Sequence, residues 1–101
     1  MAIFALTFRI HRDGGYDDRY NSTVEAIKNC CHGDEYWDEP TSFFLFENPT
    51  TSAKIADWIE ANSDFAPSKD LLTVINLTQK AYAPKGNVRE PQTLKRLMDK
   101  R

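Results

Sequence analysis

Apolar segments of two kinds alternate along this chain, and their order restricts the available folds more than any other feature. Extended segments are rich in β-branched and aromatic residues, whereas helical segments carry apolar residues three and four positions apart. In chain order the segments are residues 2–10, 20–31, 36–37, 42–46, 55–62 and 70–78. They give the order strand, helix, strand, strand, helix, strand.

Spacing and end signals identify the two helices. In the first, steps of four, three and four residues place one set of side chains on a single face. That set is Tyr20, Val24, Ile27 and Cys31. We expect this helix to start at a capping box, in which Ser22 and Glu25 satisfy each other's backbone N–H groups. Before the second helix, residues 48–51 supply a stop and an N-cap.

This order predicts an α+β domain with the ferredoxin-like βαββαβ fold. Its antiparallel sheet has four strands, and both helices lie on one face. Residues 70–78 are apolar on both faces, as a covered central strand would be. We place the domain at residues 1–80 and a basic C-terminal tail at residues 81–101. In that tail we expect a loop at residues 83–87 and a short amphipathic helix over residues 93–100.

The sheet of such a fold has a second face that its two helices do not cover. Aromatic side chains are dense in the second and third strands, denser than one helix layer would hide. They are Tyr36, Trp37, Phe43, Phe44 and Phe46. We therefore expect a homodimer that packs on the open face or on an edge of the sheet.

Composition narrows the class of protein further. The hydrophobic fraction of 41% and the charged fraction of 28% are those of an ordinary globular domain. No apolar run reaches the ~18 residues that a membrane span needs, so we expect no membrane partner. The first residues read as a strand rather than a signal peptide, and we expect a cytoplasmic location. We expect no cofactor.

Charge is distributed unevenly along the chain, whose net charge is −2. From Lys80 onward, seven basic residues against two acidic ones give residues 80–101 a net charge of +5 and leave −7 for residues 1–79. A basic arm on an acidic body can meet an anionic partner while the body resists non-specific contacts. An ordinary solvated helix with surface lysines is an equally open interpretation.

Several stretches carry a family resemblance that extends over most of the chain. They are the first strand with its Gly-containing loop (Thr7 to Tyr16), Val24 to Lys28, Trp37-Asp38 before Ser42 to Phe46, Thr51 to Asp57, and Lys69 to Ile75. On these stretches the chain resembles the small CRISPR-associated adaptation proteins and the related VapD-like and SinR-like families. The resemblance implies a ferredoxin-like fold and a homodimer.

The same resemblance bears on catalysis. Nuclease members of these families are expected to place an aspartate at the end of the first strand, where paired subunits hold a divalent metal between two carboxylates. Here the strand end reads Phe8-Arg9-Ile10. A cation at Arg9 would stand where the metal binds, so we expect no metal site and no metal-dependent hydrolysis by the family route.

Two residue pairs are weaker candidates for chemistry. His11 and Asp13 could form a general base oriented by a carboxylate, or simply a surface histidine beside a turn-forming aspartate. Cys30 and Cys31, with His32 nearby, offer metal ligands, but a structural zinc site needs a second ligand pair that the chain lacks. We therefore expect the cysteines to be reduced and packed.

Basic residues at two places could contact phosphate. They are Arg9, His11 and Arg12 after the first strand, and Lys95, Arg96, Lys100 and Arg101 in the tail. Trp37 could stack on a base, although core or dimer interface is the more usual place for such a tryptophan.

Three functions follow from these observations. The leading hypothesis is a non-catalytic, homodimeric, nuclease-like module that is nucleic-acid-associated or regulatory. The alternatives are a metal-dependent endoribonuclease and a module or inhibitor that binds another protein.

Overall fold

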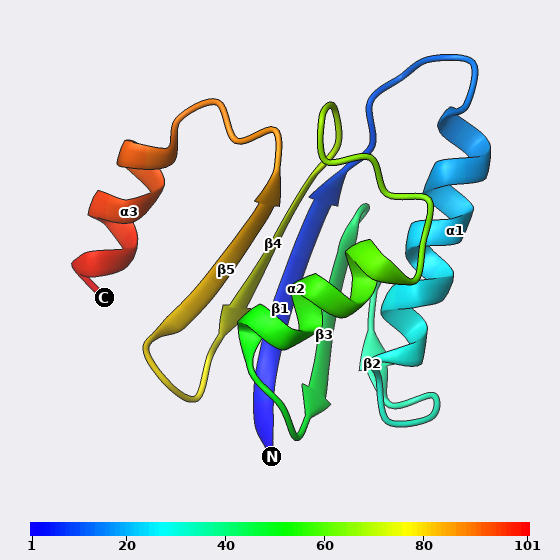
Figure 1. The fold of residues 1–101 in the computed structure, drawn as a ribbon. Coiled ribbons are helices and arrows are strands. Elements are labelled where there is room, and N and C mark those ends of the chain that lie inside the picture. Colours follow the sequence, from blue (N-terminus) through cyan, green and yellow to red (C-terminus); the bar gives the residue numbers. More distant parts are fainter.

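In the computed structural model, which describes residues 1–101, five strands and three helices follow one another (Figure 1). They are β1 (Ala2–Arg9), α1 (Tyr16–Asn29), β2 (Tyr36–Trp37), β3 (Phe43–Asn48), α2 (Ser52–Ala61), β4 (Leu71–Asn76), β5 (Ala81–Gly86) and α3 (Pro91–Asp99). None of the helices combines the length and apolar character needed to cross a bilayer.

The strands form one antiparallel sheet in the order β2-β3-β1-β4-β5. Helix α1 connects β1 to β2 across β3, and α2 connects β3 to β4 across β1, so each crossover skips one strand. The predicted α+β class is confirmed. The predicted number of strands is wrong, because the sheet has five and not four.

The additional strand is β5, which pairs with β4 along its whole length. The sequence prediction of a loop at residues 83–87 is therefore wrong over most of that stretch. Alanine, proline and glycine disfavour strands, but Pro84 is tolerated in β5 because an edge strand does not need every N–H for pairing. Pairing with β4 thus overrides the local preference of β5.

Alternate residues of the strands build the core on one face of the sheet. In β1, Phe4, Leu6 and Phe8 point to this face and are almost fully buried. Both α1 and α2 lie over this face (Figure 1). They contribute Ile27 and Ile55 to the core.

The start of α1 differs from the prediction. The helix begins at Tyr16 rather than at a capping box, because residues 13–15 form a turn in which the Tyr16 N–H donates to the Asp13 carbonyl. Ser22 lies inside the helix, and its hydroxyl accepts a hydrogen bond of 2.9 Å from the Asp64 N–H. The predicted N-cap of α2 is confirmed, since the Thr51 hydroxyl accepts from the Lys54 N–H at 3.2 Å.

Candidate binding surface

The face of the sheet opposite α1 and α2 is the candidate binding surface. Because side chains alternate along a strand, the register of the sheet determines which side chains lie on this face. We call this face the open face. Its residues are Ile3, Ala5, Thr7, Arg9, Trp37, Phe43, Leu45, Glu47, Leu71, Thr73, Ile75, Tyr82 and Pro84.

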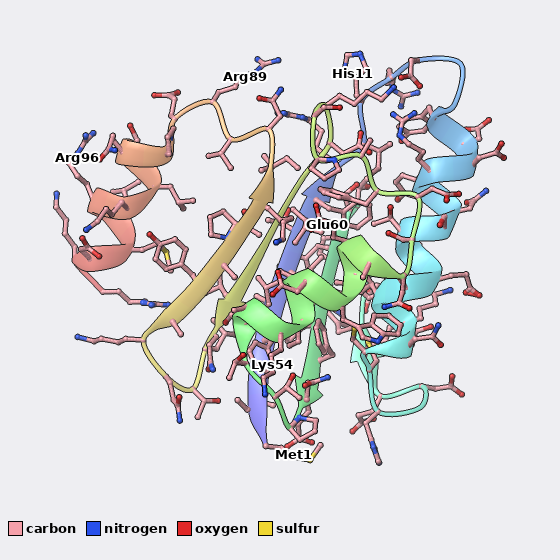
Figure 2. All side chains as sticks on the ribbon, viewed as in Figure 1. Met1, His11, Lys54, Glu60, Arg89 and Arg96 are labelled. Atoms are coloured by element: carbon pink, nitrogen blue, oxygen red, sulfur yellow. The ribbon has the colours of Figure 1, made fainter.

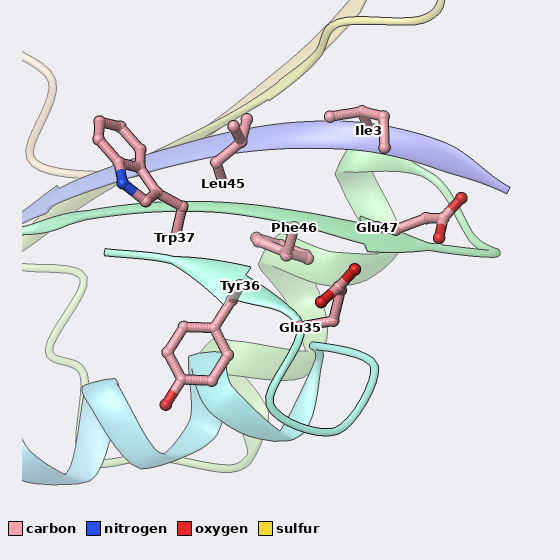
Figure 3. A pocket seen from close by; sticks show the side chains of 7 residues that line it. All are labelled: Ile3, Glu35, Tyr36, Trp37, Leu45, Phe46 and Glu47. Atoms are coloured by element: carbon pink, nitrogen blue, oxygen red, sulfur yellow. The ribbon is translucent and has the colours of Figure 1, made fainter. Parts of the chain in front are cut away.

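Apolar side chains of the open face gather around β1 and β3. Trp37 is 46% exposed and Ile3 is 39% exposed. The Trp37 ring meets Phe43 edge-on, with 5.9 Å between ring centroids, and its Nε1–H donates to Glu39. Figure 3 shows Trp37, Leu45 and Ile3 on one side of the sheet. Together they border an open groove of about 320 Å³.

The predicted aromatic cluster is divided between the two faces. Phe44 and Phe46 are buried beneath the helices, and Tyr36 packs against Phe44 with 5.6 Å between ring centroids. Figure 3 shows Tyr36 directed toward α1, away from Trp37. Trp37 and Phe43 are thus the two aromatic residues of the cluster that the helix layer leaves on the open face.

Two charged residues mark opposite ends of the open face. Arg9 is the last residue of β1 and is exposed, and Glu47 is paired in register with Ile3 near the start of β1. Neither side chain forms a salt bridge within the chain. Both charges are therefore available to a partner.

The carboxylate of Asp70, the residue before β4, lies near the end of β1 and joins three segments of the chain through hydrogen bonds. The Asp70 carboxylate is fully buried and accepts from Arg19 Nε at 3.0 Å, from the His11 N–H at 2.8 Å and from the Ala66 N–H at 2.9 Å. Arg19 also donates to the His11 carbonyl and to Asp13. This network ties the loop after β1 to α1 and to the segment before β4.

The network shifts the ionisation of its carboxyl groups. Burial alone would raise the pKa of Asp70, but hydrogen bonds from Arg19 and from two backbone N–H groups outweigh it, so the pKa lies below its usual value. Hydrogen bonds from Arg19 and Lys69 hold the pKa of Asp13 well below its usual range. Both groups therefore stay ionised at neutral pH.

His11 and Asp13 do not form a hydrogen-bonded pair. Lys69 Nζ donates to Asp13 Oδ2 at 2.8 Å, Arg19 occupies the other carboxylate oxygen, and the exposed His11 side chain makes no hydrogen bond. The Asp13 carboxylate thus serves the loop structure. Sequence analysis missed Arg19 and Asp70, the centre of this network, because they are 51 positions apart.

The predicted phosphate contacts lie in two separate places. Figure 2 shows His11 at the end of the sheet where β1 stops, and Arg96 on α3 beyond β5. Arg12 lies over the Tyr16 ring at 4.5 Å. Among the tail residues, Lys95 pairs with Asp99 at 2.6 Å, and Arg101 donates to backbone carbonyls of Asn76 and Ala81. Lys100 is exposed.

Cys30 and Cys31 are free thiols, and both are partly buried. Burial raises the pKa of Cys30 to about 11, and burial with the nearby Cys30 and Asp38 raises that of Cys31 to about 12. No group of three or more His, Cys, Asp or Glu side chains in the structure is placed to hold a metal ion.

Comparison with protein-family models, with curated proteins and with solved structures finds no match for this chain. The open face and the Asp70 network are therefore interpreted from their own geometry.

Proposed function

We propose that this chain is a ferredoxin-like, non-catalytic binding module that acts as a homodimer through its open face. The observation that carries the proposal is the exposed apolar cluster around Trp37, Leu45 and Ile3 on the sheet face opposite the helices. The ferredoxin-like unit in this proposal is β1 to β4 with α1 and α2, and β5 extends its edge.

Apolar exposure of this kind favours a protein partner. Aromatic residues are enriched in protein interfaces, and a contiguous apolar area on a monomer marks an interaction site more often than scattered single residues do. Covering Trp37 and Ile3 with a second sheet would remove this surface from water and stabilise the pair by the hydrophobic effect.

The charged groups near the end of β1 favour binding over hydrolysis. Arg9 stands where the resemblance to the CRISPR-associated and VapD-like families would place a metal-liganding aspartate, and a guanidinium repels a divalent cation. The nearby carboxylates of Asp13 and Asp70 are already engaged by Arg19 and Lys69.

Sedimentation equilibrium of two tryptophan variants tests the dimer. Trp37 on the open face and Trp58 on α2 are similarly exposed, at 46% and 40%. Trp37→Ala should weaken self-association by about tenfold, because it removes a large apolar contact, whereas Trp58→Ala should leave it unchanged. A chain that stays monomeric at all concentrations, or equal effects of the two variants, would contradict the proposal.

An anionic partner such as nucleic acid is a second candidate for what the module binds. Arg12 and Arg89 are exposed cations without an acidic partner in the chain. Labelled RNA and DNA should then bind with an affinity that falls steeply with salt. Deleting residues 93–101 should weaken this binding if the basic tail contributes to it.

The same nucleic acids, incubated with magnesium or manganese, test the metal-dependent endoribonuclease alternative. Intact substrate is expected. Cleavage that depends on the ion and disappears in a His11→Ala variant would replace the binding module with an enzyme.

A further inference from the structure

The charges at the ends of the open face specify how two copies pair. We propose that a second copy of this chain packs open face to open face with its strands running in the opposite direction, so that Arg9 of each copy meets Glu47 of the other. This inference rests on the proposed homodimer and adds its geometry.

Positions along the sheet set this arrangement. Glu47 on β3 is in register with Ile3 on β1, and Ile3 lies six positions before Arg9. All three residues belong to the open face. At about 3.4 Å per residue, the two charges lie roughly 20 Å apart along β1. They therefore belong to opposite ends of one face and cannot pair within a copy.

A twofold axis lying between the sheets can run in two main directions. If it is perpendicular to the strands, it exchanges the two ends of the face, and Arg9 of one copy lies near Glu47 of the other. If it is parallel to the strands, it places Arg9 beside its own counterpart, which like-charge repulsion disfavours. Charge complementarity therefore selects the perpendicular axis, and the operation forms the Arg9–Glu47 contact twice.

The apolar residues of β3 on the open face also agree with a twofold axis perpendicular to the strands. An axis midway between Ile3 and Arg9 exchanges the level of Ala5 along β1 with the level of Thr7. On the neighbouring strand β3, Leu45 is in register with Ala5 and Phe43 with Thr7. Leu45 of one copy then packs against Phe43 of the other, so apolar side chains meet between the two pairs of charges.

The size of the face indicates a weak dimer. Strands β3, β1, β4 and β5, at about 4.8 Å spacing and about 20 Å length, cover roughly 400 Å² per copy. Two such faces bury roughly 800 Å² in total, which is less than the ~1,200 Å² at the lower end of standard interfaces and is typical of weak, transient association. Contributions from two symmetric charge contacts should therefore be measurable as changes in the dimer dissociation constant.

Charge reversal tests the arrangement by sedimentation equilibrium of the full chain. Arg9→Glu and Glu47→Arg should each raise the dimer dissociation constant by about tenfold or more, since each places like charges together twice. The Arg9→Glu/Glu47→Arg double variant should return to within about threefold of the unmodified chain, because both contacts are restored in reverse. Lys54→Glu on α2 and Glu25→Arg on α1 change the net charge equally, lie off the open face, and should have no effect.

The outcomes separate the geometry from the proposed function. If Arg9→Glu leaves the dissociation constant unchanged while Trp37→Ala raises it, the open face is the interface but the axis is not perpendicular to the strands. Tighter association of Arg9→Gln would identify the parallel axis and overturn the inference. A chain that is monomeric throughout would overturn the proposed homodimer itself.

Discussion

Asp70 is the one charged side chain among the buried residues of this chain. A buried charge is tolerated when it is paired and hydrogen-bonded, and Asp70 accepts from Arg19 and from two backbone N–H groups. Its backbone carbonyl also accepts from the Asn87 N–H at 2.8 Å. One residue thus holds the ends of β1, α1 and β5 together.

Replacing Asp70 should therefore be costly. Asp70→Asn keeps the shape but leaves the Arg19 charge without its buried partner, and we expect the free energy of unfolding to fall by about 3 kcal/mol in urea denaturation. Asp57→Asn is the matched control, because the Asp57 carboxylate pairs with Lys85 at the surface and is 68% exposed. Its effect should stay below about 1 kcal/mol. Equal losses in the two variants would contradict the role of Asp70.

The pKa values of Asp70 and Asp13 predict how stability responds to acid. Both are lower in the folded chain than in the unfolded chain, so the unfolded state takes up protons first as pH falls. Their contribution is fully present above the ordinary aspartate pKa of about 4 and is lost as pH drops through the lower folded-state values. Urea denaturation across this range should show the loss, and Asp70→Asn should show a shallower one. An identical pH dependence in the variant would be inconsistent with this assignment.

Strand β5 depends on a close backbone approach at its last residue. Gly86 has φ of +98°, a region that residues with a side chain rarely adopt, and a Cβ at this position would collide with the Asp70 carbonyl oxygen. The end of β5 is thereby fixed against the Asp70 network.

Gly86→Ala should consequently destabilise the fold by at least about 2 kcal/mol, as measured by denaturant unfolding. Gly14→Ala provides the comparison, since a Cβ there meets no atom within 4 Å. Its effect should remain within about 0.5 kcal/mol. If Gly86→Ala were as stable as the unmodified chain, the approach of β5 to Asp70 would not constrain the fold.

Elements with strong local patterns could be predicted from the sequence, and elements defined by tertiary pairing could not. The alternation of Phe4, Leu6 and Phe8 identifies β1, and the Thr51 N-cap marks the start of α2. In contrast, β5 has low strand preference and exists because β4 offers it a paired edge. Aromatic density predicted that part of the aromatic cluster lies on the open face, but only the register shows that Trp37 lies there and that Phe44 is buried beneath the helices.

The molecule as a whole presents two unlike sides. Helices α1 and α2 cover the core on one side of the sheet (Figure 1). The other side exposes Trp37 and Ile3 and carries Arg9 and Glu47, which form no salt bridge within the chain. Helix α3 adds no buried side chain and lies beyond β5, so it leaves this second side accessible around β1 and β3. The proposed symmetric dimer would cover this second side with the same side of another copy.

Fluorescence of Trp37 tests this account most directly. The chain has two tryptophans, and Trp58→Phe leaves Trp37 as the sole reporter. On dilution from the high-micromolar to the sub-micromolar range, its emission should shift to longer wavelength in step with dissociation measured by sedimentation, because the open face becomes exposed to water. Emission that stays constant while the dimer dissociates would show that the open face is not the interface.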